Sequence, residues 1–146
     1  MARRSKTDEL LDFEISFYEK LLRVYPNFLD ALIPLGDAYT RRGLYEKGLQ
    51  VDLHLTELRG EDPTMWYNLA CSYSLLNRID DSLDALRRAL EMGYHDVDYL
   101  LQDPDLTNLR QSQPYRQFLT AFPRLAAKSA QPPQAPRPSA QPERTN

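Results

Sequence analysis

The side chains in this sequence with the greatest capacity for chemistry are one cysteine, Cys71, and two histidines, His54 and His95. A thiol and an imidazole within hydrogen-bond reach of each other form the nucleophile and base of covalent catalysis. The apolar spacing around them places the three residues on separate elements, and nothing in the register brings an imidazole to the thiol. We therefore predict structural or exposed roles for all three residues and no enzymatic activity.

Carboxylates also occur in close pairs, at Asp80 with Asp81 and at Asp103 with Asp105. Such pairs can supply acid and base groups or part of a metal-binding loop. Both pairs stand where a helix is expected to begin, and there they favour the positive end of the helix dipole. The glycine and downstream glutamate of a calcium loop are absent, and one cysteine cannot build a site of several thiolates. The sequence thus predicts no metal and no cofactor.

The size and composition of the chain limit its class. A chain of 146 residues, 42% of them hydrophobic, can bury one core and is expected to form one folded unit with extensions. No run approaches the roughly 18 apolar residues that a membrane span needs. The basic start leads into Thr7, Asp8 and Glu9 rather than an apolar signal core. These features favour a cytoplasmic protein without membrane contact, and a single cysteine agrees with a reducing compartment.

The net charge of −3 conceals an uneven distribution. Residues 8–123 carry −9, whereas the first seven residues and the segment from Arg124 onward carry +3 each. Nucleic-acid surfaces need a basic stripe that replaces the counterions of phosphate, so an acidic body argues against a nucleic-acid partner. A further hypothesis is that the basic ends fold onto the acidic body and compete with a partner for it.

Apolar residues at helical intervals predict a first helix over residues 8–25, which ends at Pro26. Leu10, Phe13 and Phe17 widen the apolar stripe of this helix. It is expected to cap the N-terminal end of the folded body.

A second helix should begin near Phe28 or Asp30 and end at Gly43, and a third should cover residues 45–58. Pro34 helps to decide where the second helix begins. An interior proline costs about 3 kcal/mol, whereas one near the first turn costs far less. This difference favours Asp30 as the capping residue.

Two further helices are expected before Gly93. Asp62 is placed to cap the fourth helix, and Pro63 suits its first position. Asn77 takes the turn between this helix and the fifth, as Gly43 takes the turn between the second and the third.

The sequence nearly repeats itself after 34 residues, where L-x-x-L-G-x-x-Y returns as W-x-x-L-A-x-x-Y. The matched residues are Leu32, Leu35, Gly36 and Tyr39 with Trp66, Leu69, Ala70 and Tyr73. Both stretches resemble the first helix of a tetratricopeptide repeat. The resemblance covers roughly residues 10–93. It implies an all-α, right-handed α/α superhelix with two full helix-pair repeats and capping helices at both ends.

The chain departs from the family pattern in the second helix of each repeat. Gly48 and Asp52, then Ser82 and Leu86, stand where the family usually has alanine and an aromatic residue. Beyond Gly93 the period fails, and a closing element is expected to hide the last apolar face of the stack. Its covering residues are expected to be Tyr99, Leu100, Leu106, Leu109, Phe118, Leu119 and Phe122.

The chain therefore divides into six predicted segments. They are a basic N-terminal extension (1–7), a capping helix (8–25), a first repeat (26–62), a second repeat (63–94), a closing helical element (95–128) and a proline-rich tail (129–146). The composition of the tail cannot bury a core, so the tail is expected to be disordered. Pro133 and Pro136, followed by Arg137, also fit a P-x-x-P ligand for an aromatic groove, the alternative to a passive tail.

The resemblance implies a concave groove lined by the first helix of each repeat. Projecting the family register onto this chain gives as groove residues Asp30, Ile33, Asp37, Thr40, Thr64, Tyr67, Asn68, Cys71 and Ser74, extended by Asp98 and Leu101. Asn68 matches the asparagine with which some relatives hold a peptide backbone or terminal carboxylate. Ile33 and Asp37 stand where two of the basic residues of a carboxylate clamp would be. The aspartates would repel an acidic ligand, so we expect a basic or mixed apolar segment.

Protein–protein recognition is the function that the resemblance implies, in a small adaptor or assembly factor that acts as a scaffold. The alternative is a structural subunit that associates with itself through the flank of its stack. A concentration-dependent mass would favour this alternative.

Overall fold

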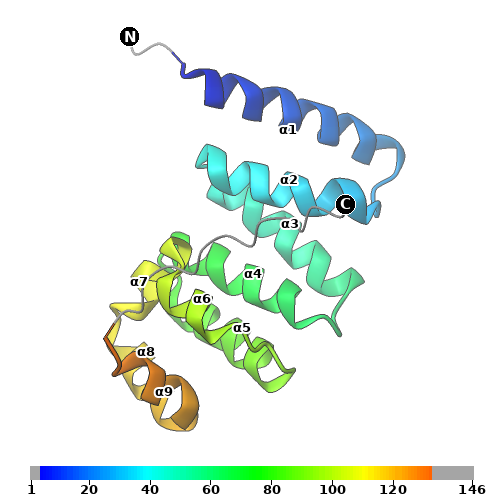
Figure 1. The fold of residues 1–146 in the computed structure, drawn as a ribbon. Helices are drawn as coiled ribbons and strands as arrows, with labels where there is room; N and C mark the ends of the chain where they lie inside the picture. Colours follow the sequence, from blue (N-terminus) through cyan, green and yellow to red (C-terminus); the bar gives the residue numbers. More distant parts are fainter. Residues whose placement is uncertain (1–3, 133–146) are drawn as a thin grey trace, which may run out of the picture.

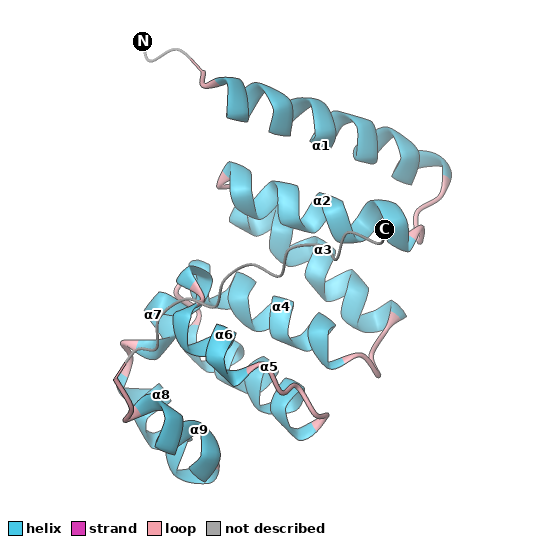
Figure 2. Cartoon of the chain, in the orientation of Figure 1, coloured by secondary structure: helices cyan, strands magenta, loops and turns pink. Residues whose placement is uncertain are grey.

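The computed structural model describes residues 4–132, and this part of the chain consists of helices joined by short loops, with no strand (Figure 2). In chain order the elements are α1 (Lys6–Val24), α2 (Leu29–Arg42), α3 (Tyr45–Leu58), α4 (Pro63–Leu75), α5 (Ile79–Glu91), α6 (Val97–Gln102), the 3-10 helix η1 (Pro104–Leu106), α7 (Thr107–Arg110), α8 (Gln113–Phe118), the 3-10 helix η2 (Leu119–Ala121) and α9 (Pro123–Ser129). None of the helices within this range combines the length and apolarity that crossing a bilayer requires.

Consecutive helices from α1 to α5 pack in pairs and form an elongated stack (Figure 1). One core cluster joins α1, α2 and α3 through residues such as Leu11, Leu35 and Leu55. A second cluster joins α4 and α5 to the closing helices, with Leu86 and Leu109 completely buried. The prediction of an all-α fold built from consecutive helix pairs is confirmed.

Most helix ends follow the local signals of the sequence. Residues 45–58 form α3 as predicted. The Asp62 side chain accepts a hydrogen bond from the backbone N–H of Thr64 at 2.9 Å, and Pro63 is the first residue of α4. Asn77, with φ of +57°, takes the turn before α5. These ends depend on contacts within a few residues, which is why a sequence reveals them.

The predicted capping role of Asp30 is wrong. The second helix begins at Leu29, so Pro34 lies inside it, and Phe28 occupies the cap position without a side-chain hydrogen bond. The Phe28 carbonyl accepts hydrogen bonds from the backbone N–H groups of Ala31 and Leu32. Both of these side chains are buried. Core packing therefore starts the helix two residues earlier than a cap at Asp30 would, at the cost of the backbone hydrogen bond that Pro34 cannot donate.

Gly43 ends α2 in the left-handed region, with φ of +83°. Nothing lies within 4 Å of the position that a Cβ would take, so the constraint is on the backbone. We expect Gly43→Ala to lower the free energy of unfolding, measured by urea denaturation, by about 1 kcal/mol. Gly43→Asn should cost less, because asparagine at position 77 adopts the same region in the equivalent turn. Equal losses for the two variants would contradict this explanation.

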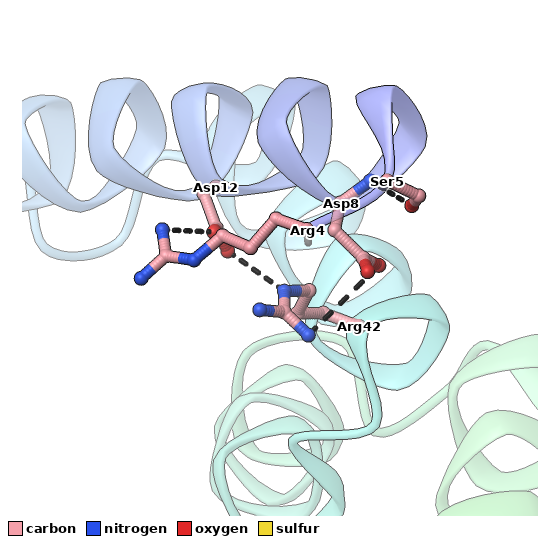
Figure 3. Close-up of polar contacts among 5 residues, drawn as sticks. All are labelled: Arg4, Ser5, Asp8, Asp12 and Arg42. Carbon is pink, nitrogen blue, oxygen red and sulfur yellow. Dashed lines mark hydrogen bonds and ion pairs between the residues drawn. The ribbon is translucent and has the colours of Figure 1, made fainter. Parts of the chain in front are cut away.

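The first helix is fastened to α2 by a charged network (Figure 3). The Arg42 Nε donates a hydrogen bond to Asp12 Oδ1 at 2.8 Å, and its guanidinium lies 3.9 Å from Asp8 Oδ1. This hydrogen bond is the largest cause of the lowered pKa of Asp12. Arg4 pairs with the same carboxylate at 3.2 Å, and the Ser5 hydroxyl accepts a hydrogen bond from the Asp8 N–H. The network connects the N-terminal half of α1 to the C-terminal end of α2.

The predicted extensions are only partly covered by the described residues. Arg4, from the basic N-terminal end, does contact an acidic residue of the body, Asp12. The tail boundary predicted at residue 129 shifts, because Ser129 belongs to α9 and its hydroxyl donates to the Leu125 carbonyl. Residues 133–146 of the proline-rich tail, with the P-x-x-P motif, lie outside the described residues, as do residues 1–3 of the N-terminal extension.

Candidate functional site

The closing segment folds back onto α4, the first helix of the second pair. The Asn108 Nδ2 donates to the Ser74 carbonyl at 3.0 Å, and the Leu109 N–H donates to the Ser74 hydroxyl at 3.2 Å. Ser74 is completely buried, and Tyr67 and Cys71 are 3% and 7% exposed. The prediction that these three residues contact a peptide is therefore wrong. The predicted groove continued from α4 to Asp98 and Leu101, whereas η1 and α7 pack on α4 and cover these three residues.

A hydrogen-bonded cluster fills the covered part of the predicted groove. The Tyr67 hydroxyl donates to Asp103 Oδ2 at 2.6 Å, and the Cys71 Sγ lies 3.6 Å from the same oxygen. Asp103 Oδ1 accepts the backbone N–H of Asp105 and so caps η1. The Tyr67 ring stacks on Tyr94 with 4.2 Å between centroids. The cluster fastens the closing segment to the stack.

The chemistry of Cys71 follows from this environment. Burial is the main reason that the pKa of Cys71 lies well above its ordinary value, and the neighbouring Asp103 raises it further. The thiol is therefore held in its protonated form, which is a poor nucleophile. His54 lies on α3, where its Nε2 is 2.8 Å from Asn27 Oδ1 in the turn after α1. Within residues 4–132, no group of three histidine, cysteine or acidic side chains could hold a metal ion.

The two residues predicted to extend the groove stabilise the closing segment instead. Asp98 lies 3.0 Å from the Lys128 Nζ and so connects α6 to α9. Leu101 is half-buried against the second core cluster. Tyr99, which was expected to hide the last apolar face, is 52% exposed. Its neighbour Leu100 takes the buried position instead, at 0% exposed.

The part of the predicted groove on α2 remains accessible. Asp30, Ile33 and Asp37 are exposed, as is Thr64 at the start of α4. Thr40 and Asn68 are half-buried. Ile33 and Asp37 are one helical turn apart, so they share a face of α2.

Asp37, on this part of α2, lies within electrostatic range of the closing segment. Asp37 is near enough to raise the pKa of both Tyr99 and Asp105, although burial is the larger cause for each. Asp37 also forms an exposed ion pair with Arg41 at 3.7 Å. We call the surface formed by Ile33, Asp37, Tyr99 and Asp105 the acidic face. Tyr99 and Asp105 were absent from the predicted groove because they come from a segment outside the repeat pattern.

A second exposed surface lies on the outer side of α1. Leu10, Phe13 and Val24 are 65%, 71% and 68% exposed, and Phe17 is 52% exposed. Leu10, Phe13 and Phe17 were predicted to widen the stripe of α1 that faces the core. Only Leu11 and Ile15 are buried, so α1 has a second apolar stripe on its opposite side.

The described residues thus define a class, an all-α stack of helix pairs with a closing segment folded onto the second pair. No family model matches the sequence. The chain is similar to a chloroplastic protein of Arabidopsis thaliana, with 36% identity over 93 residues. The match covers 60% of this chain and 27% of the relative, so the chain spans about a quarter of the length of the protein it matches.

Proposed function

We propose that this chain is a tetratricopeptide-like recognition module that binds a basic or mixed apolar segment of a partner protein. The observation that supports this most directly is the acidic face, which combines the exposed Ile33 and Tyr99 with the carboxylates of Asp37 and Asp105. Apolar side chains beside charges of one sign suit a ligand with apolar residues and charges of the opposite sign.

The electrostatics of the acidic face favour a cationic ligand. The pKa of Asp105 is raised mainly by burial and further by the negative charges of Asp103 and Asp37. A lysine or arginine side chain placed beside Asp37 and Asp105 would offset this unfavourable charge. An acidic ligand would add to it, in agreement with the basic or mixed apolar segment expected from the sequence.

A peptide-display selection on the immobilised protein tests the proposal. We expect the retained peptides to be enriched in lysine or arginine beside apolar residues. In the Asp37→Lys variant, binding of a selected peptide should weaken by about tenfold at low salt, because one attractive charge becomes repulsive. Fluorescence polarisation at two salt concentrations measures this change.

Asp84→Lys is the matched control, because Asp84 is exposed on α5 and, like Asp37, precedes an arginine by four residues. It should bind the selected peptide as the wild type does. Peptides rich in acidic residues, or equal losses for the two variants, would refute recognition by the acidic face.

The cellular compartment stays a prediction. The sequence favours a cytoplasmic address, whereas the name of the Arabidopsis relative places that protein in the chloroplast. Imaging of a fluorescent fusion of the full-length protein in its native cells distinguishes the two compartments.

A further inference from the structure

The outer side of α1 carries an apolar surface on which no other helix of residues 4–132 packs. We call it the outer stripe, and it consists of the exposed Leu10, Phe13, Phe17 and Val24 together with the half-buried Leu21. The intervals of three and four residues keep these side chains on one side of the helix. The opposite side packs on α2 through Leu11 and Ile15.

The surface is large enough to be an interface. Beyond the outer stripe, the apolar surface continues to Tyr25 and Phe28, which are 61% and 43% exposed. Side chains of this size, exposed to these fractions, present on the order of 600 Å² of apolar area in total. Isolated patches on monomeric proteins seldom exceed this size. Two copies would together bury on the order of 1,200 Å², which reaches the lower limit of stable interfaces.

We infer that the outer stripe is the interface between two copies of this chain, whose α1 helices pack antiparallel about a two-fold axis near Phe17. This arrangement places Leu10 of each copy opposite Val24 of the other. It likewise places Phe13 opposite Leu21. Each apolar side chain of the stripe thus has an apolar counterpart, and Phe17 of one copy lies against Phe17 of the other.

The shape of the surface supports the antiparallel direction. An open apolar pocket of ≈ 580 Å³ lies at the C-terminal end of α1, lined by Leu21, Val24, Tyr25, Pro26, Asn27 and Phe28. Phe13, the most exposed ring of the stripe, lies eight residues before Leu21. Antiparallel packing brings each Phe13 to the pocket of the other copy. Parallel packing would instead place the two pockets against each other and leave both unfilled.

Charge supports the same direction. Glu9 and Glu14 are exposed in the first half of α1, whereas Lys20 and Arg23 are exposed in the second half. Antiparallel packing places the acidic half of one helix next to the basic half of the other. It also gives the two helix dipoles opposite directions, which is the favourable arrangement. Parallel packing would place like charges together, with Lys6 as the one basic residue in the acidic half.

Sedimentation velocity over a range of protein concentrations tests for the dimer. The wild type should change from monomer to dimer as its concentration rises. Phe13→Glu should weaken the association by more than about 100-fold, because the two-fold axis places the substitution in the interface twice. Ile33→Glu, at an exposed apolar residue of α2, is the control and should dimerise as the wild type does.

Disulfide capture tests the direction of packing. Phe17→Cys should form a disulfide-linked dimer under mild oxidation, since two-fold symmetry brings the two sulfurs together. Leu10→Cys should not, because the two copies of position 10 would be about 21 Å apart along the axis. The native Cys71 is buried and serves as the internal negative control in the wild type.

Three results would overturn the inference. If the protein stays monomeric at every concentration, the stripe is not a dimer interface, and a different occupant, such as a helix of another protein, would have to cover it. A dimer that persists in Phe13→Glu would place self-association elsewhere. A disulfide-linked dimer of Leu10→Cys would show parallel packing.

Discussion

Replacing Leu109 with alanine should destabilise the protein by about 2–5 kcal/mol and make Cys71 react with thiol reagents. Leu109 is completely buried in the second core cluster, and truncation there leaves a cavity beside the contacts that hold the closing segment on α4. Its backbone N–H donates to the Ser74 hydroxyl, one of those contacts. Opening of the closing segment uncovers Cys71, which is 7% exposed in the folded protein.

The reaction rate with a thiol reagent reports this opening directly. When opening precedes modification, each loss of about 1.4 kcal/mol of stability raises the population of the open form tenfold. We therefore expect the modification of Cys71 to accelerate by at least about 20-fold in Leu109→Ala. Urea denaturation of the same variant measures the loss of global stability.

Leu11→Ala is the matched control. Leu11 is 4% exposed and belongs to the first core cluster, between α1 and α2, away from the closing segment. Its truncation should destabilise the protein by a similar amount without exposing Cys71 through local opening. If both variants accelerated the modification equally, Cys71 would become accessible only by unfolding of the whole domain, and the separate opening of the closing segment would be refuted.

The second large effect is expected at Asp52, which carries a buried carboxylate between the two helix pairs. Its side chain accepts a hydrogen bond from the Ser72 hydroxyl at 2.5 Å. Asp52 also packs closely against Gly36, because a Cβ added at Gly36 would lie 3.3 Å from Asp52 Oδ1. Burial raises the pKa of Asp52 to about 6, although the bond from Ser72 partly offsets this.

The direction of the pH dependence follows from the raised pKa. In the unfolded chain this carboxyl ionises near pH 3.8, whereas in the folded protein it holds its proton up to about pH 6. The protonated Asp52 therefore contributes stability fully below pH 3.8, and this contribution is lost as the pH rises through about 6. At neutral pH the folded protein contains a buried, ionised carboxylate.

We expect Asp52→Asn to raise the free energy of unfolding by about 2–3 kcal/mol at a pH of about 7.5. The neutral amide still accepts the Ser72 hydrogen bond and carries no charge to desolvate. At a pH of about 4 the gain should nearly vanish, because Asp52 is then protonated in the folded protein. Urea denaturation at several pH values between about 4 and 8 measures the difference, with the exposed Asp84→Asn as control. A gain that is the same at every pH would contradict the raised pKa.

The helices themselves were predictable from the sequence because their signals are local. The capping carboxylate of Asp62 and the left-handed turn residues Gly43 and Asn77 act within a few positions of where they stand. The 34-residue shift of the apolar pattern predicted the order of the helix pairs. The start of α2 near Phe28 was predicted, but the preference for Asp30 as its capping residue was wrong, since burial of Ala31 and Leu32 outweighs the local cost of a proline inside the helix.

The accessible part of the candidate site was only partly predictable. Asp37 and Ile33 could be placed by the repeat register, because they lie on the face of α2 away from its buried residues. Tyr99 and Asp105 join them from a segment where the period has failed. No spacing rule connects residues 33–37 with residues 99–105, so their approach became evident only in three dimensions.

The sequence by itself determined an all-α chain, its helix boundaries to within a turn and the succession of its pairs, because helical periodicity and capping are local properties. Only the tertiary structure decided which helix faces stay open. The closing segment covers Tyr67, Cys71 and Ser74 through contacts from residues more than 30 positions away. The outer stripe of α1 stays exposed because residues 4–132 provide no helix to cover it. Coverage depends on the path of the chain through space, which the apolar pattern of one helix does not encode.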